Sequence, residues 1–170
     1  MAYIALRYFY PETFLAAHEH LSIPLGSLNT FVLITSSLTM ALAVRAAQTD
    51  KQQQLVFYLV TTTVFACIFL VVKYFEYSHK IHAGMLPGSW YAGPAMPGEP
   101  GLFFALYFVM TGMHGLHVII GIGILIWLIY RARQGTYHSG YFTYIENFGL
   151  YWHFVDLIWI FLFPLLYLVK

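Results

Sequence analysis

Two histidines, His114 and His117, stand in the middle of a long stretch, Pro100 to Tyr130, that has no Asp, Glu, Lys or Arg. Their i, i+3 spacing would place both on one side of a helix. Imidazole groups can ligate a metal or haem iron, relay protons, or join helices by hydrogen bonds. In an apolar segment they usually face protein, so their chemistry depends on the other polar groups that reach them.

Two further i, i+3 pairs combine charged or imidazole groups: Lys73 with Glu76, and His153 with Asp156. A carboxylate inside an apolar segment is costly unless it is paired, so Asp156 requires a neighbouring histidine or hydroxyl. Glu76 can pair with Lys73 on its own helix or turn toward a histidine of the next segment. The sequence leaves both arrangements open.

Depth along the helices argues against one shared metal site. We expect Glu76 near one membrane boundary, His114 roughly 10–15 Å below that boundary, and His153 near the opposite boundary. Metal ligands must converge within about 2–2.6 Å of one ion, and a bis-histidine haem requires a second central histidine on another helix. We therefore expect these residues to form neither one shared metal site nor a bis-histidine haem site.

The composition is that of an integral membrane protein. Of 170 residues, 60% are hydrophobic and 9% are charged, whereas a soluble domain has about 25% charged residues. A net charge of +1 argues against binding to nucleic acid. The single cysteine, Cys67, excludes a disulfide within the chain.

Four apolar segments are long enough to cross a bilayer. They show no strand-like alternation of polar and apolar residues, so they must be helices, whose backbone hydrogen bonds are all made within the segment. The sequence thus predicts an all-α bundle in one domain, residues 1–170, with a short N-terminal helical tail and an interfacial Gly/Pro loop at 79–100. The predicted spans are about 25–47, 54–78, 101–131 and 148–169.

Glycines recur along the third predicted span, at Gly112, Gly115 and Gly121. Small residues allow membrane helices to approach each other closely. We therefore expect a closely packed helix contact along this glycine-bearing side.

Four motifs, in this order along the chain, resemble subunit III of the haem-copper cytochrome c oxidases. They are Leu28-Asn29-Thr30-Phe31-Val32-Leu33 with Ser36-Ser37, Phe75-Glu76-Tyr77, Thr111-Gly112-Met113-His114-Gly115-Leu116-His117-Val118-Ile119-Ile120-Gly121, and Tyr151-Trp152-His153-Phe154-Val155-Asp156. They are similar to parts of the family's fourth, fifth, sixth and seventh helices, and the resemblance covers about residues 25–169.

The resemblance implies a non-catalytic subunit that supports assembly, lipid retention and proton uptake by the catalytic subunit I. It implies that haem and copper lie in that partner, that phospholipids bind, and that the membrane is a bacterial plasma membrane. Arg131 matches a lipid-headgroup contact. A set of conserved intramembrane polar positions, which we interpret as a structural network, is matched by Glu76, His114, His117, His153 and Asp156.

The chain also departs from the family pattern. The family's first two helices have no counterpart, and residues 2–10 match only the tail of its third, so we expect a shortened chain or helices supplied by other subunits. The loop at 79–100 exceeds the expected link, which suggests contact with a partner such as a cytochrome domain.

Alternative functions are the matching subunit of a quinol oxidase or of a nitric-oxide-reductase-associated homologue. An alternative of a different class is a small membrane b-haem or di-metal protein.

Overall fold

The computed structural model describes residues 8, 23–84, 90, 92 and 100–167. These residues form four long helices and no strand beyond one isolated bridge between His138 and Tyr141. The helices are α3 (Ile23–Gln48), α4 (Gln52–His82), α5 (Pro100–Arg133) and α6 (Thr143–Tyr167). The prediction of an all-α fold is confirmed.

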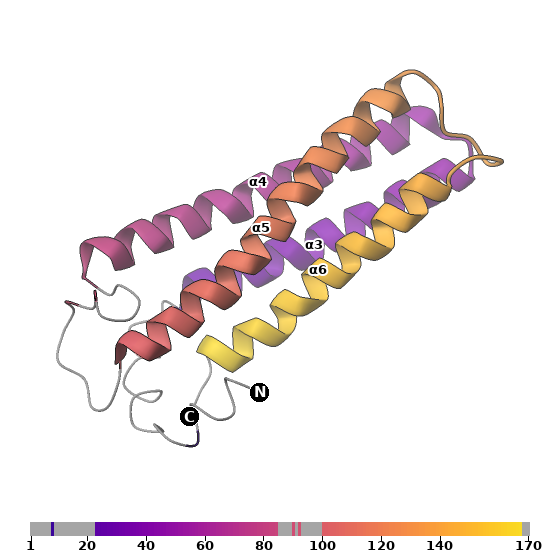
Figure 1. Cartoon of the computed structure of the whole chain (residues 1–170). Helices are drawn as coiled ribbons and strands as arrows, with labels where there is room; N and C mark the ends of the chain where they lie inside the picture. Colours follow the sequence, from indigo (N-terminus) through magenta and orange to yellow (C-terminus); the bar gives the residue numbers. More distant parts are fainter. Residues whose placement is uncertain (1–7, 9–22, 85–89, 91, 93–99, 168–170) are drawn as a thin grey trace.

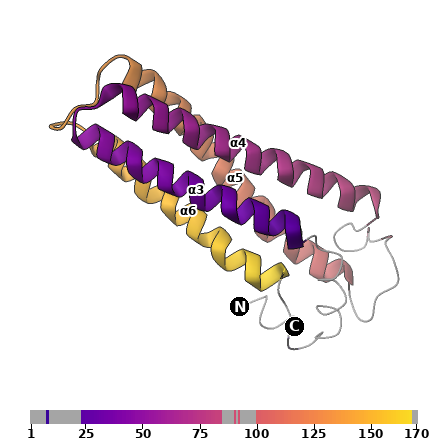
Figure 2. The same cartoon turned by 180° about the vertical axis from the view of Figure 1, so that it is seen from behind.

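The four helices lie side by side in one bundle (Figures 1 and 2). Helix α3 packs against α4 and α6, and α5 packs against the same two helices, so the order around the bundle is α3, α4, α5, α6. The α3–α4 turn and the α5–α6 connection lie at the same end, here called the turn end.

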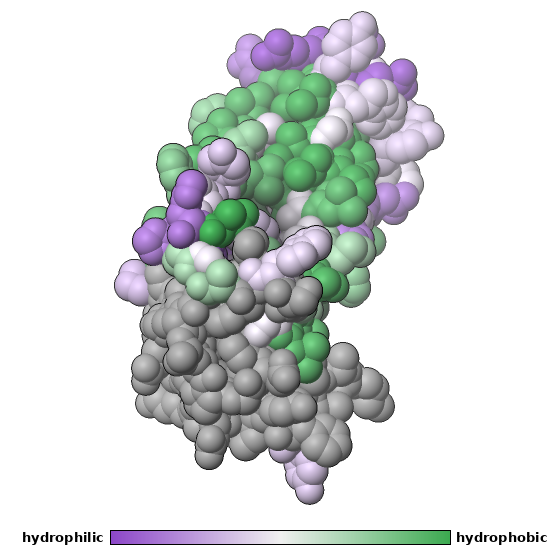
Figure 3. All heavy atoms as spheres, turned by 60° about the vertical axis from the view of Figure 1, so that its left-hand side comes forward, coloured by the Kyte–Doolittle hydropathy of each residue, from purple (hydrophilic) through white to green (hydrophobic). Residues whose placement is uncertain are grey.

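Each of the four helices is long and apolar enough to cross a membrane. The shortest has 25 residues, which spans roughly 37 Å at 1.5 Å per residue and exceeds a hydrocarbon core of about 30 Å. Hydrophobic side chains cover the middle of the face seen in Figure 3, and hydrophilic residues gather toward the turn end.

Two helices extend at least four residues beyond their predicted limits at one end. Helix α4 continues to His82, four residues past the predicted end, because Lys80 reaches back to Glu76 and is buried. Helix α6 begins at Thr143, and Glu146 in its first turn favours an N-terminus there. The predicted N-terminal tail, apart from Tyr8, and residues 168–169 lie outside the described residues.

Two tryptophan side chains of α6 donate hydrogen bonds to α3. The Trp152 N–H donates to Ser36 Oγ at 3.0 Å, and the Trp159 N–H donates to Thr30 Oγ1 at 3.1 Å. Both tryptophans have no exposed surface. A buried indole N–H requires an acceptor, so these two bonds fix how α6 is rotated against α3.

Candidate functional site

A cluster of three charged residues lies within helix α4. Lys73 Nζ is 2.8 Å from Glu76 Oε2, and Lys80 Nζ is 3.3 Å from Glu76 Oε1. The Tyr107 hydroxyl of α5 donates to Glu76 Oε1 at 3.0 Å. All four side chains are buried. Of the two arrangements that the sequence left open, the structure has Glu76 paired on its own helix.

Aromatic faces complete the surroundings of the two ammonium groups. Lys73 Nζ lies 4.4 Å from the centroid of the Trp159 ring, and Lys80 Nζ lies 4.7 Å from that of Tyr107. An ammonium over an aromatic face is attracted by the negative face of the ring. The cluster therefore connects α4 to α5 and α6.

The buried His114 belongs to an aromatic contact. Its ring centroid lies 5.4 Å from that of Phe69 and 5.1 Å from that of Trp159. Neither imidazole nitrogen has a hydrogen-bond partner among the described residues. His114 thus shares Trp159 with Lys73, but no hydrogen bond within this part of the chain joins it to Glu76.

His153 and Asp156 face α3. Ser37 Oγ lies 2.5 Å from His153 Nδ1. Neither Asp156 oxygen has a hydrogen-bond partner among the described residues, although Ser37 lies beside the carboxyl. Ser37 is bonded to the histidine one turn away, and the pairing expected for Asp156 is not seen within these residues.

His117 lies apart from the other four residues of the predicted network. Its side chain is exposed on the outer surface of α5, and its Nδ1 bonds to the Met113 carbonyl at 2.7 Å. The Tyr151 hydroxyl of α6 donates to the His117 carbonyl at 2.9 Å. The five predicted residues thus occupy three places: the α4 cluster with the neighbouring His114, the α3–α6 contact, and the outer face of α5.

Three important partners were not singled out from sequence. Lys80 was assigned to a loop, although its i, i+4 spacing from Glu76 was a usable signal. The contacts of Tyr107 with Glu76 and of Trp159 with Lys73 could not be predicted from residue spacing, because they depend on how separate helices are rotated.

The glycines of α5 do not all lie in close contacts. A Cβ added at Gly121 would stand 2.5 Å from the Trp152 ring, whereas one added at Gly112 or Gly115 would have no atom within 4 Å. These two glycines instead line an outward groove of about 620 Å³ between α4 and α5. The expected close contact is therefore present at Gly121 and absent at the other two positions.

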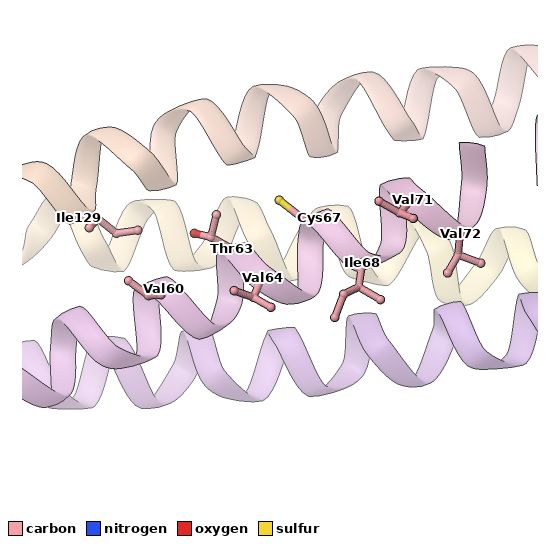
Figure 4. Close-up of a pocket in the computed structure, with 8 residues that line it drawn as sticks. All are labelled: Val60, Thr63, Val64, Cys67, Ile68, Val71, Val72 and Ile129. Atoms are coloured by element: carbon pink, nitrogen blue, oxygen red, sulfur yellow. The ribbon is translucent and has the colours of Figure 1, made fainter. Parts of the chain in front are cut away.

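A second groove of about 390 Å³ runs along the outer side of α4. In Figure 4, Cys67 and the valines of α4 line it, with Ile129 of α5 at one end. Its lining is almost entirely apolar, as expected for a surface that meets lipid or another membrane helix.

At the turn end, Arg131 lies beside two aromatic side chains. Its guanidinium carbon is 5.6 Å from the Trp127 ring centroid, and its Nε is buried without a hydrogen-bond partner among the described residues. The Tyr137 phenol lies next to it. Burial raises the pKa of Tyr137, and the neighbouring Arg131 opposes that rise.

The α3–α4 turn and the α5–α6 connection are joined by a hydrogen bond at the turn end. The Ser139 backbone N–H donates to Asp50 Oδ1 at 2.5 Å, and this bond lowers the pKa of Asp50. Asp50 itself has a φ of 56°, in the left-handed region that Asp and Asn tolerate better than most residues. Nearby, the Gln52 amide donates to the Ala132 carbonyl.

Within the ranges that the structure describes, no three His, Cys, Asp or Glu side chains come together in a way that could hold a metal ion. Some buried polar groups make contacts between helices, such as Trp152 with Ser36 and Tyr107 with Glu76. Others, such as His114, have no hydrogen-bond partner among the described residues.

Comparison with known proteins gives a family and several relatives. A family model described as cytochrome c oxidase subunit III matches residues 3–170. A protein named probable quinol oxidase subunit 3 from Staphylococcus haemolyticus is 27% identical over 151 residues, which cover 89% of this chain and 70% of that protein. Proteins of the same name from Staphylococcus saprophyticus and Staphylococcus aureus are 26% identical over the same shares of both chains.

Proposed function

Because this chain belongs to the cytochrome c oxidase subunit III family, we propose that it is the non-catalytic subunit III of a bacterial quinol oxidase. The observation that carries the proposal is the family match over residues 3–170, nearly the whole chain. Four long apolar helices agree with a subunit embedded in the membrane.

The relatives favour quinol as the electron donor. All three carry the name probable quinol oxidase subunit 3, whereas the sequence motifs resemble the cytochrome c oxidases. The complex would oxidise quinol to quinone and reduce dioxygen to water at the haem and copper of subunit I. That complex lies in the bacterial plasma membrane.

In this proposal the chain supports the assembly of subunit I, the retention of phospholipid, and proton uptake during turnover. Buried polar contacts fix the helices relative to one another: Trp152 with Ser36, Trp159 with Thr30, and Glu76 with its two lysines. A rigid bundle can then present apolar outer faces to subunit I and to lipid. Of the predicted network, we assign this structural role to Glu76, His114, His153 and Asp156, whereas His117 lies on the outer face of α5.

Arg131 is the residue that we assign to a phospholipid headgroup. A guanidinium carries several fixed N–H donors and suits a phosphate group. Arg131 is half-buried rather than fully enclosed, and its position at the end of a span suits the headgroup layer. The contact of residues 79–100 with a cytochrome domain remains a prediction, since most of that segment lies outside the described residues.

Purification from native membranes in a mild detergent tests this function. A tagged chain should bring down a large subunit that contains haem and copper, and the complex should consume oxygen with a reduced quinol. Reduced cytochrome c is the control donor. Faster oxygen consumption with cytochrome c would refute the assigned donor, and the absence of any haem-copper subunit would refute the assigned complex.

A further inference from the structure

The exposed side chain of His117 is a polar group on a helix surface that faces hydrocarbon. It is 17 residues from the start of α5 and 16 from its end, so it lies roughly 25 Å from each end and near the middle of the membrane. The outward residues one turn to either side, Met113 and Ile120, are apolar and about half exposed. A lone imidazole at this depth normally faces protein.

The local hydrogen bond defines what His117 requires. Its Nδ1 lies 2.7 Å from the Met113 carbonyl, and a carbonyl oxygen can only accept, so Nδ1 carries the hydrogen. In a neutral imidazole the other nitrogen, Nε2, is then an acceptor. No donor within the described part of the chain bonds to it.

Lipid does not provide the missing donor. Acyl chains have no N–H or O–H group, and an unsatisfied polar group in hydrocarbon is costly. A hydroxyl, indole or amide on another membrane helix would satisfy Nε2 at this depth.

The bond from Tyr151 indicates where that helix lies. Because the Tyr151 hydroxyl reaches the His117 carbonyl, His117 stands on the α6 side of α5. Phe154 and Ile158 follow Tyr151 at helical spacing, and both are exposed. The outward surface of α5 and α6 thus combines large apolar side chains with one hydrogen-bond acceptor.

We infer that this surface, formed by Met113, His117 and Ile120 of α5 with Phe154 and Ile158 of α6, binds a transmembrane helix of another oxidase subunit. That helix presents a hydrogen-bond donor to Nε2 of His117. The inference rests on the proposed function for the identity of the complex. Beyond that function, it specifies which surface of this chain binds the partner helix and which chemical group that helix presents.

Two substitutions at His117 test the hydrogen bond in the purified complex. His117→Leu removes the acceptor, and we expect the chain to be released from the haem-containing subunit about three- to tenfold more readily as detergent is raised, since one hydrogen bond is lost. His117→Gln retains an acceptor oxygen and should remain near wild type. Ile120→Leu is the control for apolar packing on the same surface.

A photoreactive amino acid at Ile120 tests the surface in native membranes. Crosslinks to another membrane protein are expected. Wild-type retention of His117→Leu, together with crosslinks to lipid alone, would overturn the inference while leaving the proposed function intact. A wild-type chain without any haem-copper partner would refute the proposed function, whereas the crosslinks would still report whether a protein covers this surface.

Discussion

The ring of Trp152 lies so close over Gly121 that a single added Cβ would stand 2.5 Å from Cζ3 of the indole. Trp152 cannot easily move away, because its N–H donates to Ser36 and its ring stacks on Phe148. The absence of a side chain at Gly121 therefore allows α5 to approach α6 this closely. The Trp152 indole at this contact also holds α6 against α3.

Gly121→Ala should destabilise the bundle by about 1–3 kcal/mol, the usual cost of forcing extra volume into a packed contact. Gly123→Ala is the matched control, because a Cβ there meets no atom within 4 Å and alanine favours the helix. The measurement is loss of helical circular dichroism as the purified chain is titrated with a denaturing detergent. Equal midpoints for the two variants would contradict the close contact.

Glu76→Gln should be among the most destabilising single changes in the chain. It removes the carboxylate that pairs with both Lys73 and Lys80 while their ammonium groups stay buried. Breaking a buried ion pair from one side costs about 3–5 kcal/mol. The same detergent titration measures this loss.

The control for that change is Glu146→Gln, at an exposed carboxylate in the first turn of α6. A surface substitution of this kind should stay within about 0.5 kcal/mol of wild type. If Glu76→Gln behaved like this control, the buried cluster would not contribute to stability.

The number and type of helices could be predicted from sequence because the bilayer leaves few choices. Uncharged runs long enough to span must be helical, since lipid cannot bond to free backbone groups. The ends were harder to predict. Lys80 resembled a residue outside the membrane, yet its i, i+4 spacing from Glu76 allows it to be buried.

The contacts of the site residues could not be predicted in the same way. In a membrane helix the lipid-facing side is as apolar as the core side, so hydropathy does not reveal how a helix is rotated. His114 and His117 are three residues apart, yet the first is buried against Trp159 and the second is exposed. Glycine spacing was equally ambiguous, because Gly121 is closely packed and Gly112 lines an open groove.

Asp50→Ala should loosen the turn end by removing the acceptor of the Ser139 N–H. Hydrogen exchange at the Ser139 amide should be faster than in wild type, whereas Asp50→Asn keeps an acceptor and tolerates the positive φ. An unchanged exchange rate in Asp50→Ala would contradict the bond.

This difference should also depend on pH. The Ser139 bond lowers the pKa of Asp50 below its ordinary value of 3.8, so the folded state binds the proton less readily than the unfolded state. The stabilisation is therefore fully present above the unfolded pKa and is lost as pH falls through the lowered folded pKa. Below that folded value the protonated carboxyl is a weaker acceptor, so the difference in Ser139 exchange between wild type and Asp50→Ala should shrink.

Arg131→Ala should reduce the phospholipid that copurifies with the complex and should speed its inactivation during turnover. The guanidinium is the group that we assign to the headgroup phosphate, and it lies in the last turn of α5, at the end of the span. Arg133→Ala, two residues further along α5, is the charge-matched control. Lipid mass spectrometry of the purified complexes makes the comparison, and equal lipid content in the two variants would refute the assignment.

The central claim is that this chain supports a haem-copper enzyme without holding its metals. The most direct measurement is the haem and copper content of the purified complex before and after the chain is released by stronger detergent. We predict that the depleted complex keeps all of its haem and copper, and that the released chain has no haem absorption. Haem or copper leaving in stoichiometric amounts with the chain would contradict the account.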